Sequence, residues 1–199
     1  MRRAIVFLLF CAALAAAAAP EWAALRARYL SLKTLSGSFD ETISDASGGP
    51  AQRFTGSFRI RLPGRYRLEV DSPQKQLIVC DSTTLWIYLP AEQRALRQPA
   101  VGPSPVLAFL DPVLDPNTEA EVYTDSSGRK SVRILTPDSL SALGDLTLEL
   151  DASAERIAAF SFTDGWGNRT RFALKNQQWN PRLAARLFTF TPPKGTTIE

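Results

Sequence analysis

From residue 38 onward, apolar and polar side chains alternate with a period of two along most of the chain. Between Phe54 and Leu62 the apolar positions alternate with arginine and hydroxyl residues, and after Pro63-Gly64 the alternation resumes as far as Val70. This pattern predicts two antiparallel strands joined by a tight turn, each with one apolar and one charged face. The same period predicts further strands over residues 77–81, 84–89, 95–97, 119–124, 130–136, 145–151, 156–163, 168–176 and 187–191.

Residues 20–35 follow a helical period instead. Trp22, Leu25, Tyr29 and Leu32 lie at i, i+3, i+7 and i+10, whereas the basic residues fall at other positions. The segment begins with a proline, which suits the first turn of a helix because no N–H is needed there. We therefore predict a helix with one apolar face that packs on the rest of the domain.

A proline-rich segment over residues 100–117 interrupts the strand pattern. Ser104-Pro105 has the form of a helix N-cap followed by a first-turn proline, and an apolar run follows it. We predict a short helix here, carried on a loop, that needs an apolar surface to cover. The residues of this predicted lid helix are Val106, Leu107, Phe109 and Leu110.

The first nineteen residues have the composition of a secretory signal peptide. Arg2 and Arg3 precede an apolar stretch over residues 4–14, and a run of alanines over 15–19 offers cleavage sites. A membrane-anchoring helix is the alternative, but the apolar stretch is shorter than the roughly 20 residues needed to span a bilayer. We expect this segment to be removed and residues 20–199 to form one exported domain.

The predicted fold class of this domain is mostly β (α+β), with about ten to eleven strands and two short helices. Two short helices cannot cover the whole apolar face of such a sheet. The large residues on that face either form the core of a barrel or sandwich, or line a cavity for an apolar ligand that the lid helix partly closes. Periodicity alone does not separate these interpretations. The residues concerned are Phe54, Phe58, Ile60, Leu62, Tyr66, Leu68, Val70, Trp86 or its neighbour Leu85, Phe160, Phe162 and Phe172.

The composition excludes most catalytic and metal sites. The chain has no His and two Cys, which excludes Ser-His and Cys-His catalysis, His-ligated metals and a four-cysteine zinc site. Asp111 and Asp115 each precede a proline, which is ordinary turn chemistry, so we assign them no catalytic role. Cys80, in an apolar run, is predicted to be a small buried hydrophobic residue. We expect a non-enzymatic protein without a metal or cofactor.

The basic charge balance depends on the targeting segment. The chain has 23 Lys and Arg against 20 Asp and Glu, and removal of Arg2 and Arg3 leaves 21 against 20. A nucleic-acid partner is therefore not expected.

Near its C-terminus the chain carries Phe188-Thr189-Phe190-Thr191 followed by Pro192-Pro193-Lys194-Gly195. With this stretch and several earlier segments it resembles the LolA family of periplasmic lipoprotein carriers, and the stretch is the most distinctive part of the resemblance. Single motifs of this kind recur in many β proteins, whereas their order along an exported chain is more specific. The matching segments are residues 35–39, 56–69, 85–88, 164–170 and 188–195.

The resemblance implies an unclosed antiparallel β half-barrel whose concave apolar face is covered by helices. It also implies a monomeric periplasmic chaperone that binds the acyl chains of lipoproteins. Its partners would be the acylated lipoproteins, an ATP-driven exporter in the inner membrane and a receptor at the outer membrane. A periplasmic lipid-binding or lipoprotein-sensing protein on the same fold is the alternative.

The chain departs from the LolA family at Leu62, where the family usually places a basic residue that holds the lid through polar contacts. Arg61 is adjacent, but the period of two sends it to the opposite face unless the register slips. We expect regular register and a lid held by apolar packing alone. Four arginines, on the charged strand face, form either a partner-docking surface or a solvated face. They are Arg59, Arg61, Arg65 and Arg67.

Overall fold

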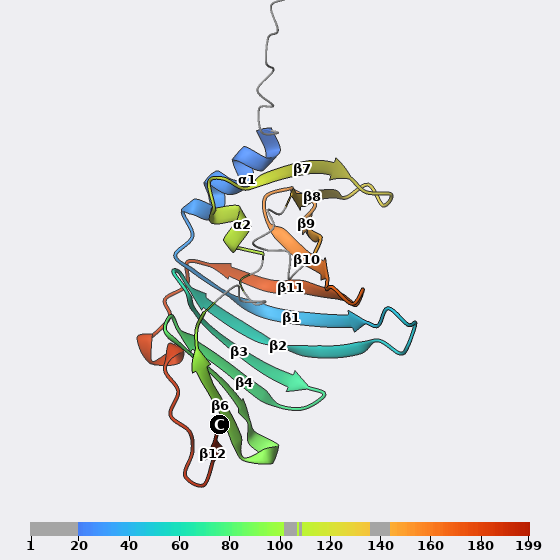
Figure 1. The fold of residues 1–199 in the computed structure, drawn as a ribbon. Coiled ribbons are helices and arrows are strands. Elements are labelled where there is room, and N and C mark those ends of the chain that lie inside the picture. The colour runs from blue at the N-terminus through green and yellow to red at the C-terminus, as the bar shows by residue number, and fades with distance from the viewer. Residues whose placement is uncertain (1–19, 102–106, 108, 136–143) are drawn as a thin grey trace, which may run out of the picture.

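The computed structural model describes residues 20–101, 107, 109–135 and 144–199. They form one twelve-stranded sheet in the order β12-β6-β5-β4-β3-β2-β1-β11-β10-β9-β8-β7 (Figure 1). The strands are β1 (Thr34–Ser44), β2 (Gln52–Arg61), β3 (Arg65–Ser72), β4 (Gln76–Asp81), β5 (Thr84–Leu89), β6 (Arg94–Pro99), β7 (Glu119–Thr124), β8 (Lys130–Leu135), β9 (Leu146–Leu150), β10 (Ile157–Thr163), β11 (Arg169–Trp179) and β12 (Thr197–Ile198).

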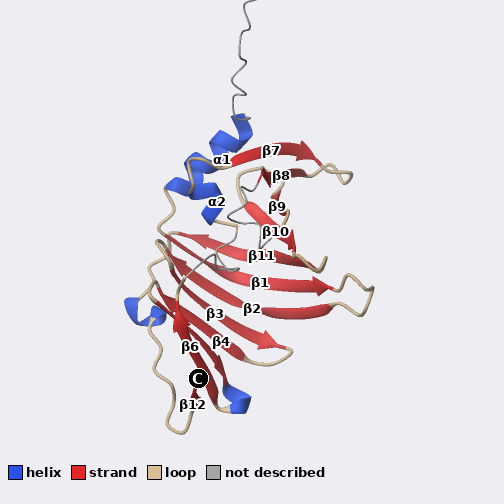
Figure 2. Ribbon diagram, viewed as in Figure 1, coloured by secondary structure: helices blue, strands red, loops and turns tan. Residues whose placement is uncertain are grey.

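The sheet is curved and unclosed, with β12 and β7 at its two edges. Neighbouring strands pair antiparallel, except for the parallel pair of β12 and β6. The helices α1 (Pro20–Leu30) and α2 (Asp111–Leu114) lie inside the curve near β7, and the short helix η3 (Ala185–Phe188) lies outside it (Figure 2). The helix η1 (Pro90–Glu92) joins β5 to β6. The predicted half-barrel is confirmed, with one strand more than expected.

The N-terminal helix is shorter than predicted. Its apolar residues Trp22, Leu25 and Tyr29 are buried as expected, but the helix ends at Leu30 and Thr34 already begins β1. The prediction to residue 35 was wrong because Leu35 is buried through the alternation of β1, which the helical spacing does not distinguish. Within the described residues, no helix is long and apolar enough to cross a membrane.

The strand predicted over residues 187–191 is not formed. Residues 185–188 make η3, and Phe188 and Phe190 then pack on the outer face of the sheet instead of entering it. The chain joins the sheet later, where β12 pairs with β6 and the Glu199 N–H donates to the Ala95 carbonyl at 2.9 Å.

The lid segment also differs from the prediction. Leu107, Phe109 and Leu110 are buried in turns, and the helix of this region is α2, which starts one residue after the predicted lid helix. Pro112 occupies the first turn of α2, where its missing N–H is tolerated. Val106 and the predicted signal segment 1–19 lie outside the described residues.

Candidate functional site

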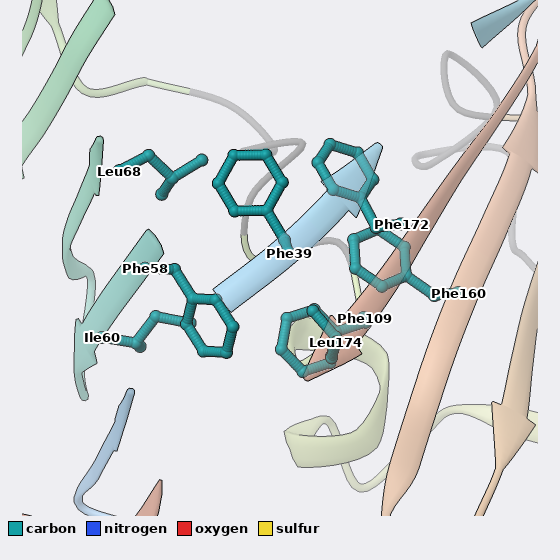
Figure 3. Close-up of a pocket in the computed structure, with 8 residues that line it drawn as sticks. All are labelled: Phe39, Phe58, Ile60, Leu68, Phe109, Phe160, Phe172 and Leu174. Carbon is teal, nitrogen blue, oxygen red and sulfur yellow. The ribbon is translucent and has the colours of Figure 1, made fainter. Parts of the chain in front are cut away.

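The concave face encloses an apolar cavity of about 20 Å³. Its lining comes from four strands at the middle of the sheet, from β3, and from the turn that precedes α2 (Figure 3). The lining residues are Phe39, Phe58, Ile60, Leu68, Phe109, Phe160, Phe172 and Leu174.

Four aromatic rings form one side of this cavity. Phe109 stacks on Phe160 with ring centroids 4.9 Å apart and an angle of 20° between the rings. Phe160 stacks in turn on Phe172 at 4.9 Å and 11°, and Phe172 meets Phe39 at 5.9 Å. Phe109 is 2% exposed and comes from the covering segment, which we define as the described residues 107 and 109–114, whereas the other three rings belong to the sheet. These three rings form an aromatic floor, and the covering segment, or cover, places the Phe109 ring on it.

Two glycines make room for the rings at the centre of the sheet. A Cβ atom at Gly56 would lie 2.9 Å from the Phe39 ring and 2.1 Å from the Glu69 carbonyl oxygen. A Cβ atom at Gly37 would lie 2.8 Å from the Phe58 ring. Real Cβ contacts are not this short, so the β1–β2 pair needs glycine at both positions to hold Phe39 and Phe58 flat against the strands.

The cavity is closed in this structure. A volume of about 20 Å³ holds roughly one water molecule, whereas pockets for organic ligands have volumes of roughly 300–1,000 Å³. Leu107, Phe109, Leu110 and Val113 of the cover are each at most 6% exposed. An organic ligand therefore has room only if the cover moves and gives up its contacts with the floor.

Most of the predicted cavity residues lie on the concave face. Five of them line the cavity directly, Tyr66 and Val70 are buried in the same core, and Phe54, Leu62 and Phe162 are partly buried against it. The five lining residues are Phe58, Ile60, Leu68, Phe160 and Phe172.

The prediction missed Phe39 and Leu174, although the period of two carries the signal for both. Phe39 alternates with the buried Leu35 on β1, and Leu174 is two residues after Phe172 on β11. These two residues are direct cross-strand partners, so they close the cavity between β1 and β11.

Trp86 was placed on the wrong face by the prediction. It pairs with Val79 on β4, and its ring meets Phe190 at 5.6 Å on the outer face of the sheet. Its neighbour Leu85 pairs with Cys80 and packs on the concave core. The run 84–89 is apolar on both faces, so alternation does not decide its orientation. Cys80 is buried as predicted.

The register of β2 is regular up to Arg61, which pairs with Thr34 on one side and Arg65 on the other. The one irregularity between β2 and β3 lies at Thr55/Gly56. Arg61 therefore points to the outer face, and the register does not slip at Leu62. Leu62 packs partly buried against the concave core.

Polar contacts to the cover come from α1 instead. Arg26 Nε donates to the Val113 carbonyl at 3.1 Å, and its Nη2 and Nη1 donate to the Asp115 carbonyl at 2.9 Å and the Pro116 carbonyl at 3.4 Å. These carbonyls lie at the C-terminal end of α2, where backbone acceptors lack helical partners. The expectation that apolar packing alone holds the cover was wrong. The sequence pattern of α1 does not show which backbone carbonyls accept hydrogen bonds from Arg26.

The helix α1 is itself fixed to the sheet. The Ile157 N–H donates to the Tyr29 hydroxyl at 2.9 Å, and the Tyr29 ring meets Trp179 edge-on at 4.8 Å. Burial raises the pKa of the Tyr29 hydroxyl above its ordinary value, so the group stays neutral. Through α1, Arg26 thus connects α2 to β10 and β11.

The predicted docking arginines face outward, where two of them hold the C-terminal segment. Arg61 Nη2 donates to the Leu183 carbonyl, and Arg67 Nη1 donates to the Leu187 carbonyl at 3.4 Å. Arg59 and Arg67 also form ion pairs with Glu69 at 3.1 and 2.7 Å. Arg65 is exposed. A docking role for these four residues stays a prediction.

The model of the family "Outer membrane lipoprotein carrier protein LolA" matches residues 30–191. The chain belongs to the LolA family. An outer-membrane lipoprotein carrier protein of Xylella fastidiosa is 31% identical over 173 residues, which cover 84% of this chain and 81% of that protein. The carrier of Methylibium petroleiphilum is 27% identical over 202 residues, covering 100% of this chain and 98% of its own.

Solved structures agree with the fold of this LolA-family chain. A LolA superfamily protein from Nitrosomonas europaea superposes with a TM-score of 0.50 at 10% identity, covering 87% of this chain and 99% of that one. A conserved protein from Thermus thermophilus gives a TM-score of 0.54 at 11% identity, covering 87% and 94%. At identities this low, the superpositions support the overall fold and nothing finer.

Proposed function

We propose that this protein is a periplasmic chaperone that binds the acyl chains of lipoproteins and carries them to the outer membrane. The observation that carries the proposal is the closed apolar cavity, filled from the covering segment by Phe109. Burial of an acyl chain is worth about 0.8 kcal/mol per CH₂ group, or about 12 kcal/mol for 16 carbons, so such a chain does not cross water unshielded. The relatives' names, outer-membrane lipoprotein carrier protein, point to the same cargo.

In the proposed cycle, the acyl chain replaces the cover on the aromatic floor. Phe109 and its apolar neighbours contact the floor in the closed form, and the chain makes equivalent apolar contacts once the cover has moved. Because one set of contacts is exchanged for the other, binding remains reversible and the cargo can be released. The three hydrogen bonds of Arg26 are lost or rearranged when α2 moves away from α1, so they favour the closed form.

The proposed partners follow from this role. An ATP-driven exporter in the inner membrane supplies the lipoprotein, and a receptor at the outer membrane accepts it. Residues 1–19 direct export and are then removed. The outward arginines that retain exposed surface, Arg65 above all, are the proposed contacts for one of these partners. A lipoprotein-sensing role is the less favoured alternative, since the similar proteins are named carriers. No catalytic step is part of the proposal.

The test is to isolate the protein from the periplasm and identify bound molecules by mass spectrometry. Acylated proteins should copurify with the native chain and with Arg53→Ala, a control on an exposed outer position. They should be absent from Leu68→Arg, which places a charge in the cavity, provided that circular dichroism shows a folded sheet. Recovery of no acylated protein with the native chain, even from cells blocked in lipoprotein sorting, contradicts the proposal.

A further inference from the structure

A carboxyl group lies on the concave face beside the cavity. Glu41 of β1 pairs directly with Phe54 of β2 and with Phe172 of β11. Direct cross-strand partners share a face of the sheet, and residues two apart on one strand do so as well. Glu41 therefore shares the face of Phe39 and Phe172, two residues that line the cavity.

Along β1, Glu41 lies just beyond the cavity-lining Phe39, a position termed here the rim of the cavity. Successive residues on one face of a strand are roughly 6.5–7 Å apart. Glu41 is thus one such step from Phe39, on the side away from the start of β1 and from α1. An acyl chain that lies over Phe39 and Phe172 and leaves the cavity on this side passes the Glu41 side chain.

Glu41 has neither a hydrogen bond nor an ion pair within the described part of the chain. The neighbouring positions on its face are Phe54, Phe172, Thr170 and Gln52, which carry no charge. On β1 and its two partner strands, the charged residues next to Glu41 face outward. Asp40 is paired with Lys175, while Arg53 and Arg171 are the cross-strand partners of Thr42.

An unpaired carboxyl in apolar surroundings is costly when it is charged. Burial raises the pKa of Glu41 to about 7, so the neutral form is well populated at neutral pH. A neutral carboxyl carries one O–H donor. The esters and amides that join acyl chains to their carriers present a carbonyl oxygen, which accepts a hydrogen bond, next to the first CH₂ group of the chain.

Building on the acyl-carrier function proposed above, we propose that Glu41 is the polar contact of the acyl site: its protonated carboxyl donates a hydrogen bond to the carbonyl oxygen of the bound acyl ester or amide. The apolar cavity then holds the chain, while Glu41 sets how deep the chain lies by fixing its first polar group at the rim. The contact also makes binding sensitive to pH.

The sign of this pH effect follows from the form that binds. The protonated carboxyl binds the carbonyl, whereas the carboxylate has no donor and must be desolvated beneath the ligand. Affinity is therefore greatest below pH 7 and falls as the pH rises through the pKa of Glu41. We expect a loss of at least fivefold between pH 6 and pH 8.5.

The experiment measures the affinity of a fluorescent 16-carbon monoacylglycerol, which is an uncharged ester, and of the matching N-acyl amide at several pH values. The affinity of the native chain for both probes should fall as the pH rises. Glu41→Gln keeps a hydrogen-bond donor that does not titrate. Its affinity for both probes should therefore be near the native value at pH 6 and should not change with pH. Glu41→Leu should bind more weakly at pH 6 and also show no pH dependence. Asp40→Asn, on the outer face of the same strand, should retain the native profile.

Other outcomes overturn the inference in distinguishable ways. A fall with pH that persists in Glu41→Gln shows that another group titrates. Equal, pH-independent affinity in the native chain, Glu41→Gln and Glu41→Leu shows that Glu41 does not touch the ligand. Tighter binding of a 16-carbon alkylamine at high pH, lost in Glu41→Gln, assigns a carboxylate–ammonium contact instead. If the native chain binds neither probe at any pH, the carrier function itself fails.

Discussion

The two faces of β2 are covered in different ways. On the concave face, Phe58 and Ile60 line the cavity beneath a cover that contributes the apolar Phe109. On the outer face, Arg61 donates a hydrogen bond to the Leu183 carbonyl and lies 5.4 Å from the Phe188 ring. The outer segment is further held by contacts of Phe190 with Trp86 and Tyr88, and by the pairing of β12 with β6.

The difference indicates which of the two segments that cover the sheet can move away from it. Apolar contacts are not directional, so an acyl chain can replace those of Phe109 with little change in free energy. A hydrogen bond to a backbone carbonyl needs a donor, and an acyl chain has none. The Phe109 contacts of the concave cover are thus suited to exchange with lipid, although the hydrogen bonds of Arg26 to this cover oppose its opening. The outer segment is suited to remain in place.

The largest effects are expected within the aromatic stack, where one ring belongs to the floor and one to the cover. Phe160→Ala and Phe109→Ala each remove a buried ring, so each should lower the free energy of unfolding by about 3–5 kcal/mol, measured by urea denaturation. Their effects on the affinity for the acyl probe should be opposite. Phe160→Ala should weaken binding at least fivefold, because the chain loses part of its floor.

Phe109→Ala should strengthen binding of the same probe about tenfold. The ring contacts the floor only in the closed form, so its loss favours the open form that binds, and a tenfold change corresponds to about 1.4 kcal/mol. Isothermal titration calorimetry of Phe160→Ala and Phe109→Ala at one temperature measures both changes in affinity for the acyl probe. Weaker binding by Phe109→Ala would place this ring in the ligand site and not in the cover.

On the outer face, Arg61→Met should lower the free energy of unfolding by about 1.5–3 kcal/mol. The substitution leaves the Leu183 carbonyl without its charged donor and removes the cation from the Phe188 ring. Affinity for the acyl probe should not change, since the outer segment takes no part in exchange. Arg65→Met, at an exposed position, is the control and should stay within about 0.5 kcal/mol of the native chain. A changed affinity in Arg61→Met would mean that the two faces are coupled.

The smallest effect is expected at the connection between α1 and α2. Arg26→Gln removes the guanidinium donors to the Val113 and Asp115 carbonyls, and should raise affinity for the acyl probe about threefold to fivefold, which is roughly 1 kcal/mol. Arg28→Gln, on the same helix, breaks an exposed ion pair with Glu155 and should leave the affinity unchanged, since such pairs contribute little. Equal effects of the two variants would show that the Arg26 contacts do not hold the cover.

The period of two was sufficient to predict most strands and most of the cavity lining. It succeeded where one face is charged and the other apolar, as between Phe54 and Leu62. It failed at Trp86, because the strand 84–89 has apolar residues on both faces and the C-terminal segment buries the outer one. Residues 187–191 belong to the same C-terminal segment and were predicted to be a strand. Apolar residues alternate in the same way in a segment that packs on a sheet and in a strand that pairs within it, so alternation does not separate the two.

Sequence patterns do not predict the contacts of the arginines. Arg26 and Arg61 are both placed correctly by periodicity on the side of their element that carries charge. Their acceptors, however, are backbone carbonyls 87 and 122 positions away in the chain. Any residue supplies such a carbonyl, so no pattern of side chains marks the partner. Sequence patterns likewise do not mark Glu41, which has no hydrogen bond or ion pair within the described residues and whose cross-strand partners are Phe54 and Phe172.

The amino-acid sequence is enough to predict the alternation of the strands, the apolar surface that they must bury, the absence of His-based chemistry and the resemblance to the LolA family. These properties follow from local spacing and composition. Three features came only from the folded chain: Phe109 closes the cavity to about 20 Å³, α1 contacts α2 through Arg26, and the C-terminal segment covers the outer arginines. Each of these depends on which distant segments meet, and that is set by strand order and sheet curvature.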